Sequence, residues 1–276
     1  MNPSHLCYQL SWLCGPIYVG LMVSLIPACR MNSFVSRLAS HGKLHDSSTG
    51  SREQRFKMES WTVSKYYFSH FYRWAFLWIL CVGYVCIDRM HCWMTWWLVL
   101  LHVIRRLYEC EKVHIFRGSM HVFAYLLGLL HYTLLPLVLV APNNNLEEKA
   151  MHPIQLVVVA SVCVTAQWQQ FCHHKELANL RSACTEKDKK YFVPCTKGFQ
   201  YSYCPHYFAE IVIYVCIMVL LHPHKQSNEW SRRYNHILLC LWVFFNLSVS
   251  AHKSKQWYMS RVGTNVWKAA LIPFLF

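Results

Sequence analysis

The chain has 276 residues, of which 55% are hydrophobic and 14% are charged, and its formal net charge is +14. This composition excludes an ordinary soluble domain, in which about a quarter of the residues are charged. The basic residues lie between apolar stretches and not along one soluble face, which argues against a nucleic-acid-binding protein. The 14 cysteines contain no CxxC pair and show no zinc spacing, so we expect reduced thiols and no metal site.

Apolar stretches dominate the chain and predict an all-α, polytopic membrane protein. A helix needs about 20 mostly apolar residues to cross a bilayer. The first, second and fourth stretches reach this length, and the others do so with their polar or aromatic flanks. We therefore expect about seven transmembrane helices in one bundle. In chain order the stretches are Leu6–Ala28, Tyr67–Ile87, Trp93–Ile104, Met120–Ala141, Ile154–Gln167, Phe208–Leu221 and His236–Ala251.

The lysines and arginines occupy every second gap between these stretches. The four gap and tail segments Arg30–Lys65, Arg105–Arg117, His173–Lys197 and Lys253–Lys268 carry 7, 4, 6 and 4 of them. Because basic loops stay in the cytosol during insertion, these four segments are predicted to be cytosolic. The amino terminus then faces the lumen or exterior and the carboxyl terminus faces the cytosol.

Polar side chains at membrane depth are costly and usually mark function. Two clusters lie at the predicted cytosolic ends of the second and third spans, His70 with Tyr72, and Arg105 and Arg106 with Glu109. Each has a plainer interpretation, as interfacial anchors for the first pair and as positive-inside flanks with a salt-bridge partner for the second.

A third cluster runs from Gln167 to Glu210 and has a partner segment at His252–Tyr258. Glu210 lies one turn into an apolar helix, where an unpaired carboxylate would be expensive. It therefore needs a basic or hydroxyl partner or a ligand hydroxyl. All three clusters fall on the same predicted side, which suggests one site.

Several motifs resemble the steroid 5-alpha-reductase family, and within it the polyprenol (polyprenal) reductase branch. They are CPHYFAE at Cys204–Glu210, RRLYE at Arg105–Glu109, FSHFY at Phe68–Tyr72 and the terminal Ala270–Phe276. The resemblance covers roughly residues 62–276. It divides the chain into a first helix with a polar cytosolic connector (1–60) and a membrane catalytic domain (61–276).

The resemblance implies a seven-helix bundle in the endoplasmic reticulum membrane, with NADPH in a cytosol-facing cavity. The implied reaction is reduction of the carbon–carbon double bond in the α-isoprene unit of a polyisoprenoid lipid, which yields dolichol for protein N-glycosylation. Conjugation favours the aldehyde as the acceptor of hydride, although the alcohol stays open. No obligate protein partner is evident.

Carried over position by position, the resemblance implies a cofactor-binding set and two catalytic candidates. The cofactor set is Arg106, Gln170, His174, Arg181, Tyr191, His206, Glu210 and Tyr258. His70 and Tyr72 are the candidate proton donors, expected on the opposite side of the bundle from the cofactor set. The chain departs from the family at Lys255, where a histidine is usual, at Gly263–Trp267 and at Ser64.

Other functions stay open. The chain could be a divergent or inactive member of the family, or another membrane lipid enzyme such as an isoprenylcysteine-type methyltransferase. A transporter should show internal repeats or paired broken helices, and the sequence shows neither. A receptor would leave the motif at Cys204–Glu210 without explanation.

Overall fold

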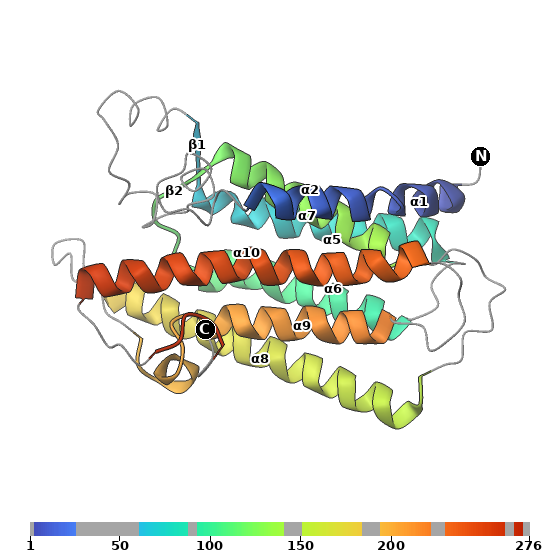
Figure 1. Ribbon diagram of the computed structural model, residues 1–276. Coiled ribbons are helices and arrows are strands. Elements are labelled where there is room, and N and C mark those ends of the chain that lie inside the picture. The colour runs from blue at the N-terminus through green and yellow to red at the C-terminus, as the bar shows by residue number, and fades with distance from the viewer. Residues whose placement is uncertain are drawn as a thin grey trace.

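The computed structural model describes residues 3–25, 61–87, 93–140, 151–183, 194–221, 230–262 and 268–272, and most of them are helical. Figure 1 shows the long helices aligned along one axis, with the amino terminus at one end and the strand pair at the other. The long helices are α1 (Pro3–Ser11), α2 (Cys14–Leu25), α5 (Phe68–Val85), α6 (Trp93–Tyr108), α7 (Val122–Val138), α8 (Pro153–Ala183), α9 (Pro205–Leu221) and α10 (Trp230–Val262).

Among the described residues, three helical stretches are long and apolar enough to cross a bilayer, Pro3–Ser24, Pro153–Ser182 and Tyr234–Ser260. Two further apolar helices are shorter, Val122–Val138 and Pro205–Leu221. The predicted class is thus confirmed as a mostly helical protein with the apolar helices of a multi-pass membrane protein. The count of seven spans stays a prediction.

The first apolar stretch is expected as one helix but is broken between α1 and α2. Pro16 has no amide hydrogen, so the helical bond to the carbonyl four residues earlier, at Trp12, cannot form. The chain makes a tighter turn there instead, with Trp12 and Leu13 donating to the carbonyls three residues back at 3.2 and 3.1 Å.

The expectation of a purely helical fold misses one short strand pair. β1 (Thr62–Ser64) pairs antiparallel with β2 (Ser119–His121), in the register Val63 opposite Met120. Three-residue strands carry too little alternation to be visible in the sequence. The pair joins the segment before α5 to the segment before α7 and so fixes both helices at the same end of the bundle.

Two helices run well past the predicted apolar stretches. α8 was expected over Ile154–Gln167 but ends at Ala183, and α10 was expected over His236–Ala251 but ends at Val262. Hydropathy marks only the part of a helix that faces lipid. The added turns carry polar side chains that pack against neighbouring elements, including four residues of the predicted site.

Short elements complete the end of the bundle that carries the strand pair. A 3₁₀ turn, η3 (Lys65–Tyr67), precedes α5, a π-helical turn, η5 (Glu109–Val113), follows α6, and a second 3₁₀ turn, η6 (Lys197–Gln200), precedes α9. Residues 268–272 return to this end, where Tyr203 donates to the carbonyl of Ala269 at 2.9 Å. The short elements next to α5, α6, α7 and α9 therefore all lie at this end of the bundle.

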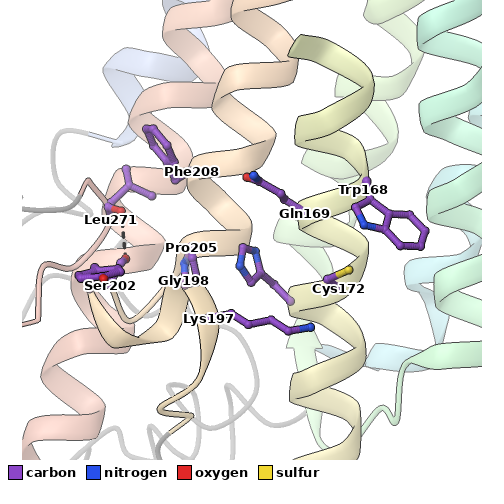
Figure 2. A pocket seen from close by; sticks show the side chains of 11 residues that line it. Trp168, Gln169, Cys172, Lys197, Gly198, Ser202, Pro205, Phe208 and Leu271 are labelled. Carbon is purple, nitrogen blue, oxygen red and sulfur yellow. Dashed lines mark hydrogen bonds between the residues drawn. The ribbon is translucent and has the colours of Figure 1, made fainter. Parts of the chain in front are cut away.

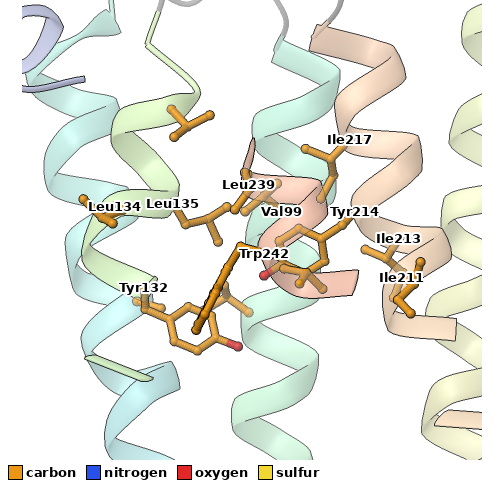
Figure 3. Packing of buried hydrophobic residues seen from close by; sticks show 14 of the residues in the cluster. Val99, Tyr132, Leu134, Leu135, Ile211, Ile213, Tyr214, Ile217, Leu239 and Trp242 are labelled. Carbon is orange, nitrogen blue, oxygen red and sulfur yellow. The ribbon is translucent and has the colours of Figure 1, made fainter. Parts of the chain in front are cut away.

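The apolar core lies between the helices and also includes Met120 of β2 and Leu271 at that end. Val99, Ile213 and Trp242 are buried side chains from α6, α9 and α10. Figure 3 shows them together with Tyr132 of α7 and Tyr214 of α9, whose hydroxyls point into the apolar cluster. Polar atoms at this depth require partners or a function.

Close packing between α5 and α7 predicts the effect of one substitution. A Cβ added at Gly128 would lie 2.8 Å from Cζ of the buried Phe71 ring. We expect Gly128→Ala to lower the free energy of unfolding by about 1–3 kcal/mol, the usual cost of overpacking, in detergent-based unfolding titrations.

The matched control is Gly20→Ala in α2, where an added Cβ has no neighbour within 4 Å. There the greater helix propensity of alanine should stabilise the protein by up to about 1 kcal/mol. Equal effects at both glycines would contradict the α5–α7 contact.

Candidate active site

A buried carboxylate organises the polar end of the bundle. Arg105 and Arg106 lie in the last turn of α6, and Glu109 opens η5, so the three side chains share one helical face at spacings of three and four. Glu109 is 0% exposed and accepts from Arg105 through Oε1 and from Arg106 through Oε2. The interpretation of Glu109 as the salt-bridge partner of these arginines is confirmed.

The second helix in the network is α8, whose extended polar part supplies Gln170 and His174. Both are buried, at 2% and 5% exposure. Gln170 accepts from Arg105 through its carbonyl oxygen and donates to the Glu210 carboxylate and to the backbone carbonyl of His206, the last at 3.2 Å. One amide thus joins the arginine pair on α6 to the carboxylate on α9.

Glu210 has the partners that its position in an apolar helix requires. Besides Gln170, His102 of α6 places its Nε2 atom 3.3 Å from Glu210 Oε1. His102 Nδ1 lies 3.2 Å from a guanidinium nitrogen of Arg105, which can only donate. His102 therefore carries its hydrogen on Nε2, facing the carboxylate. With its histidines neutral, the network holds two positive and two negative charges.

Tyr72 lies within this network. Its hydroxyl accepts from Arg106 Nε at 3.0 Å, and the guanidinium carbon lies 5.0 Å from the centre of its ring. The expectation that Tyr72 faces the cofactor set from the opposite side is therefore wrong. Helix length and polarity do not fix the rotation of α5 about its axis, so the contact was not visible in the sequence.

His70, two residues earlier, faces elsewhere. Its Nδ1 atom lies 3.1 Å from the hydroxyl of Tyr125, and its ring stacks on Tyr67 with centroids 4.6 Å apart. The described contacts of His70 thus connect α5 with α7 and η3 and not with Glu109.

The remaining predicted cofactor residues lie beside the network. Arg181 donates to the carbonyl of Ile115 at 3.0 Å, and Tyr258 stacks on Tyr203 with centroids 5.5 Å apart. The ring of Tyr207 lies 4.3 Å from the ring of His206, its neighbour in the chain. Tyr191 and the departure at Gly263–Trp267 lie outside the described residues.

Three potential metal ligands, Glu109, His114 and His174, lie within 4.8 Å of one another. Arg106 Nη1 is bonded to Glu109 and lies 2.9 Å from His174 Nδ1 and 3.4 Å from His114 Nε2. Burial, and then the charge of Arg106, lowers the pKa of His114 to about 3, so its ring is neutral at physiological pH. The guanidinium thus supplies the positive charge at the point where these ligands converge.

A cavity of about 430 Å³ opens beside the start of α9, on another face of α8. Figure 2 shows Trp168 and Cys172 of α8 on one side and Ser202, Phe208 and Leu271 on the other. The predicted cofactor residues Gln170 and His174 are not among its lining residues. The cavity is therefore separate from the ionic network, although His173 of its lining is the neighbour of His174 in the chain.

The cofactor and catalytic sets predicted from sequence omit Arg105, His102, His114 and Tyr207, although Arg105 belonged to one of the three polar clusters. In the structure each of them contacts a predicted cofactor residue. In the sequence, Arg105 and His102 lie at helical spacing from Glu109, and Tyr207 lies at helical spacing from Glu210. A buried acid within a turn of two bases was the available signal, because such an acid needs all the partners it can reach.

These features define a multi-pass helical membrane protein with a balanced, buried ionic network at one end. Comparison with known proteins identifies the family. Residues 112–276 match the profile of 3-oxo-5-alpha-steroid 4-dehydrogenase, more than half of the chain. The chain belongs to this steroid 5-alpha-reductase family of oxidoreductases, and the resemblance of its motifs is confirmed.

Individual relatives carry a more specific name. The chain is 28% identical over 274 residues to a polyprenal reductase of Saccharomyces cerevisiae, covering 97% of this chain and 94% of that protein. It is 30% identical over 193 residues to the polyprenal reductases of Xenopus tropicalis and Homo sapiens. The matched part spans 59% and 57% of the length of these two proteins.

The ion pairs of Glu109 with Arg105 and Arg106 predict that replacing Glu109 destabilises the protein much more than replacing the nearby Glu111. Glu109→Gln should lower the free energy of unfolding by about 3–5 kcal/mol, because it removes one partner of a buried ion pair and leaves an unbalanced charge. Detergent-based unfolding titrations measure the loss.

The control is Glu111→Gln, two residues away. Glu111 pairs with Arg73 at 2.8 Å, but these side chains are 33% and 53% exposed, so the loss should stay below about 1 kcal/mol. Equal losses for the two variants would show that Glu109 is not the centre of the network.

Proposed function

We propose that this protein reduces the α-isoprene double bond of polyprenal with NADPH and so supplies dolichol for protein N-glycosylation. The observation that carries the proposal is that four cofactor residues predicted from sequence, Arg106, Gln170, His174 and Glu210, meet in one buried network. The polyprenal reductase names of its relatives support the choice of substrate.

The residues present fit a dinucleotide. His206 is half-buried, and its buried Nδ1 atom has no hydrogen-bond partner among the described residues, which leaves a polar atom for a ligand. Arg181 uses one of its five N–H donors on the Ile115 carbonyl. We therefore assign the cofactor phosphates chiefly to Arg181, whereas Arg106, already bound to Glu109 and Tyr72, orders the surrounding side chains.

When bound, NADPH supplies the hydride. Glu210 and His206 would hold and orient the nicotinamide half of the cofactor, and Tyr207 and Tyr258 would pack against the half bound by Arg181. The network is balanced in charge, and Arg181 adds a positive charge outside it that would attract an anionic cofactor. The catalytic roles of His70 and Tyr72 stay predictions, and Tyr72 would act through Arg106.

Polyprenal is a better acceptor than polyprenol because conjugation with the carbonyl makes the alkene electrophilic. We propose that the isoprenoid tail stays in the bilayer and that the reaction takes place in the endoplasmic reticulum membrane. The amino terminus would be luminal, the carboxyl terminus cytosolic, and residues 61–276 would form the catalytic unit of a seven-span bundle.

A binding experiment tests the cofactor assignment. We expect Arg181→Gln to weaken NADPH binding about 10- to 100-fold, since a charge-assisted hydrogen bond contributes about 1.5–3 kcal/mol. Titration of the purified protein in nanodiscs, followed by NADPH fluorescence, gives the dissociation constant.

Arg73→Gln is the matched control, because Arg73 pairs with Glu111 near the surface and should leave NADPH binding unchanged. Stabilisation of the protein by S-adenosylmethionine but not by NADPH would favour the methyltransferase instead. NADPH binding without reduction of polyprenal would point to a divergent or inactive member of the family.

A further inference from the structure

A second polar cluster lies in the apolar core and is not used by the cofactor network. His131 of α7 places Nε2 2.9 Å from the hydroxyl of Tyr214 of α9. The ring of Tyr18, from α2, lies edge-on to His131 with centroids 6.3 Å apart. Tyr18 is 0% exposed, Tyr214 2% and His131 9%, so water does not satisfy their polar atoms.

Hydrogen-bond accounting leaves donors unused in this cluster. Neither the Tyr18 hydroxyl nor His131 Nδ1 has a hydrogen-bond partner in the described structure. If Tyr214 donates to His131 Nε2, then the hydrogen on Nδ1 is free, and if Nε2 donates, then the Tyr214 hydrogen is free. In both tautomers the pair keeps one spare donor, and Tyr18 adds a second. Buried polar groups left in this state call for a function.

The position of the cluster suits a substrate that arrives from the bilayer. Tyr214 follows Glu210 by four residues and so lies about one helical turn, roughly 6 Å, further along the same face of α9. The ring of Tyr214 lies 6.3 Å from that of His102, which faces Glu210. Figure 3 shows Tyr214 among buried apolar side chains, including Leu135 and Trp242.

We propose that Tyr18, His131 and Tyr214 bind the carbonyl oxygen of an α,β-unsaturated prenyl aldehyde and stabilise the enolate that forms from it. This proposal rests on the proposed function and names the group that receives the polar head of the substrate. Neutral donors that contact a carbonyl oxygen in a buried site stabilise the negative charge that develops on it.

The chemistry balances with the components already named. The hydride from the reduced nicotinamide forms a bond to the β carbon, the alkene π electrons move toward the carbonyl, and the oxygen becomes negative. The two donors hold this charge until a proton taken up from bulk solvent reaches the α carbon and restores the carbonyl. The alkene is reduced and the cofactor is oxidised by two electrons.

The test uses Tyr214→Phe, Tyr18→Phe and His131→Gln in the full-length protein in nanodiscs. Three quantities are measured: turnover of polyprenal with NADPH, the dissociation constant for NADPH, and equilibrium binding of tritiated farnesal without cofactor. Tyr84→Phe is the matched control, because Tyr84 is 83% exposed on α5.

We expect kcat to fall about 100-fold or more in Tyr214→Phe, the usual effect of removing an oxyanion donor. Farnesal should bind about 3- to 10-fold more weakly, as expected for one neutral hydrogen bond, and the dissociation constant for NADPH should not change. Tyr18→Phe should also lower kcat but keep or raise the thermal stability, because it removes a buried hydroxyl without a partner. A merely structural role for Tyr18 does not predict this combination.

Each outcome decides the matter. If the wild type reduces polyprenal and all three variants stay within threefold of it in kcat and in farnesal binding, the oxygen site is overturned and the proposed function stands. If the wild type shows no turnover but binds farnesal in a manner that depends on Tyr214 and His131, the site is supported and the proposed function fails. If the wild type neither turns over polyprenal nor binds farnesal, both fail.

Discussion

The pairing of one buried carboxylate with two adjacent arginines constrains the rest of this structure. Arg105 and Arg106 could not remain at a helix end packed against α8 and α9 without a counter-charge, since each buried ion costs several kcal/mol. Glu109 supplies that charge from the same turn, and the π-helical turn η5 begins at this residue. Gln170 and Glu210 complete the balance from α8 and α9. Three helices are thereby held in one rotational setting by groups that tolerate little misalignment.

The same constraint explains why α8 is so long. A helix that ended with its apolar stretch at Gln167 would leave Gln170 and His174 in a loop, where their side chains could not be held against α6 and α9. The continuing helix places both on one face, four residues apart, and directs Trp168 and Cys172 to another face, where the separate cavity opens. The first half of α8 is thus the apolar part suited to the bilayer, and its second half carries the side chains of the polar site.

Sequence patterns predicted the helices, the shared end of the polar clusters and most members of the network, because apolar length and expensive charges leave clear signals. Glu210 was identified because a carboxylate without a partner in an apolar helix is energetically unfavourable. In the structure Gln170 and His102 are its partners. Rotation of a helix about its axis leaves no such signal, which is why Tyr72 was placed on the wrong side of Arg106. Tyr18, His131 and Tyr214 were missed for another reason. Tyr18 and Tyr214 are single polar residues in apolar runs, His131 is one of a short polar group with Tyr132 and Thr133, and only the fold brings the three together from α2, α7 and α9.

The network and the core cluster form two polar layers about one turn of α9 apart, and their chemistry differs in the way that their depths require. The layer at the end of the bundle contains ions, which the protein can hold there because opposite charges are adjacent. The deeper layer contains only neutral groups, since an isolated ion among Leu135 and Trp242 would be far more costly. Neutral donors attract an aldehyde oxygen only weakly before the reaction and strongly once negative charge develops on it. A site of this kind favours the transition state over the bound lipid, and that difference is what accelerates a reaction.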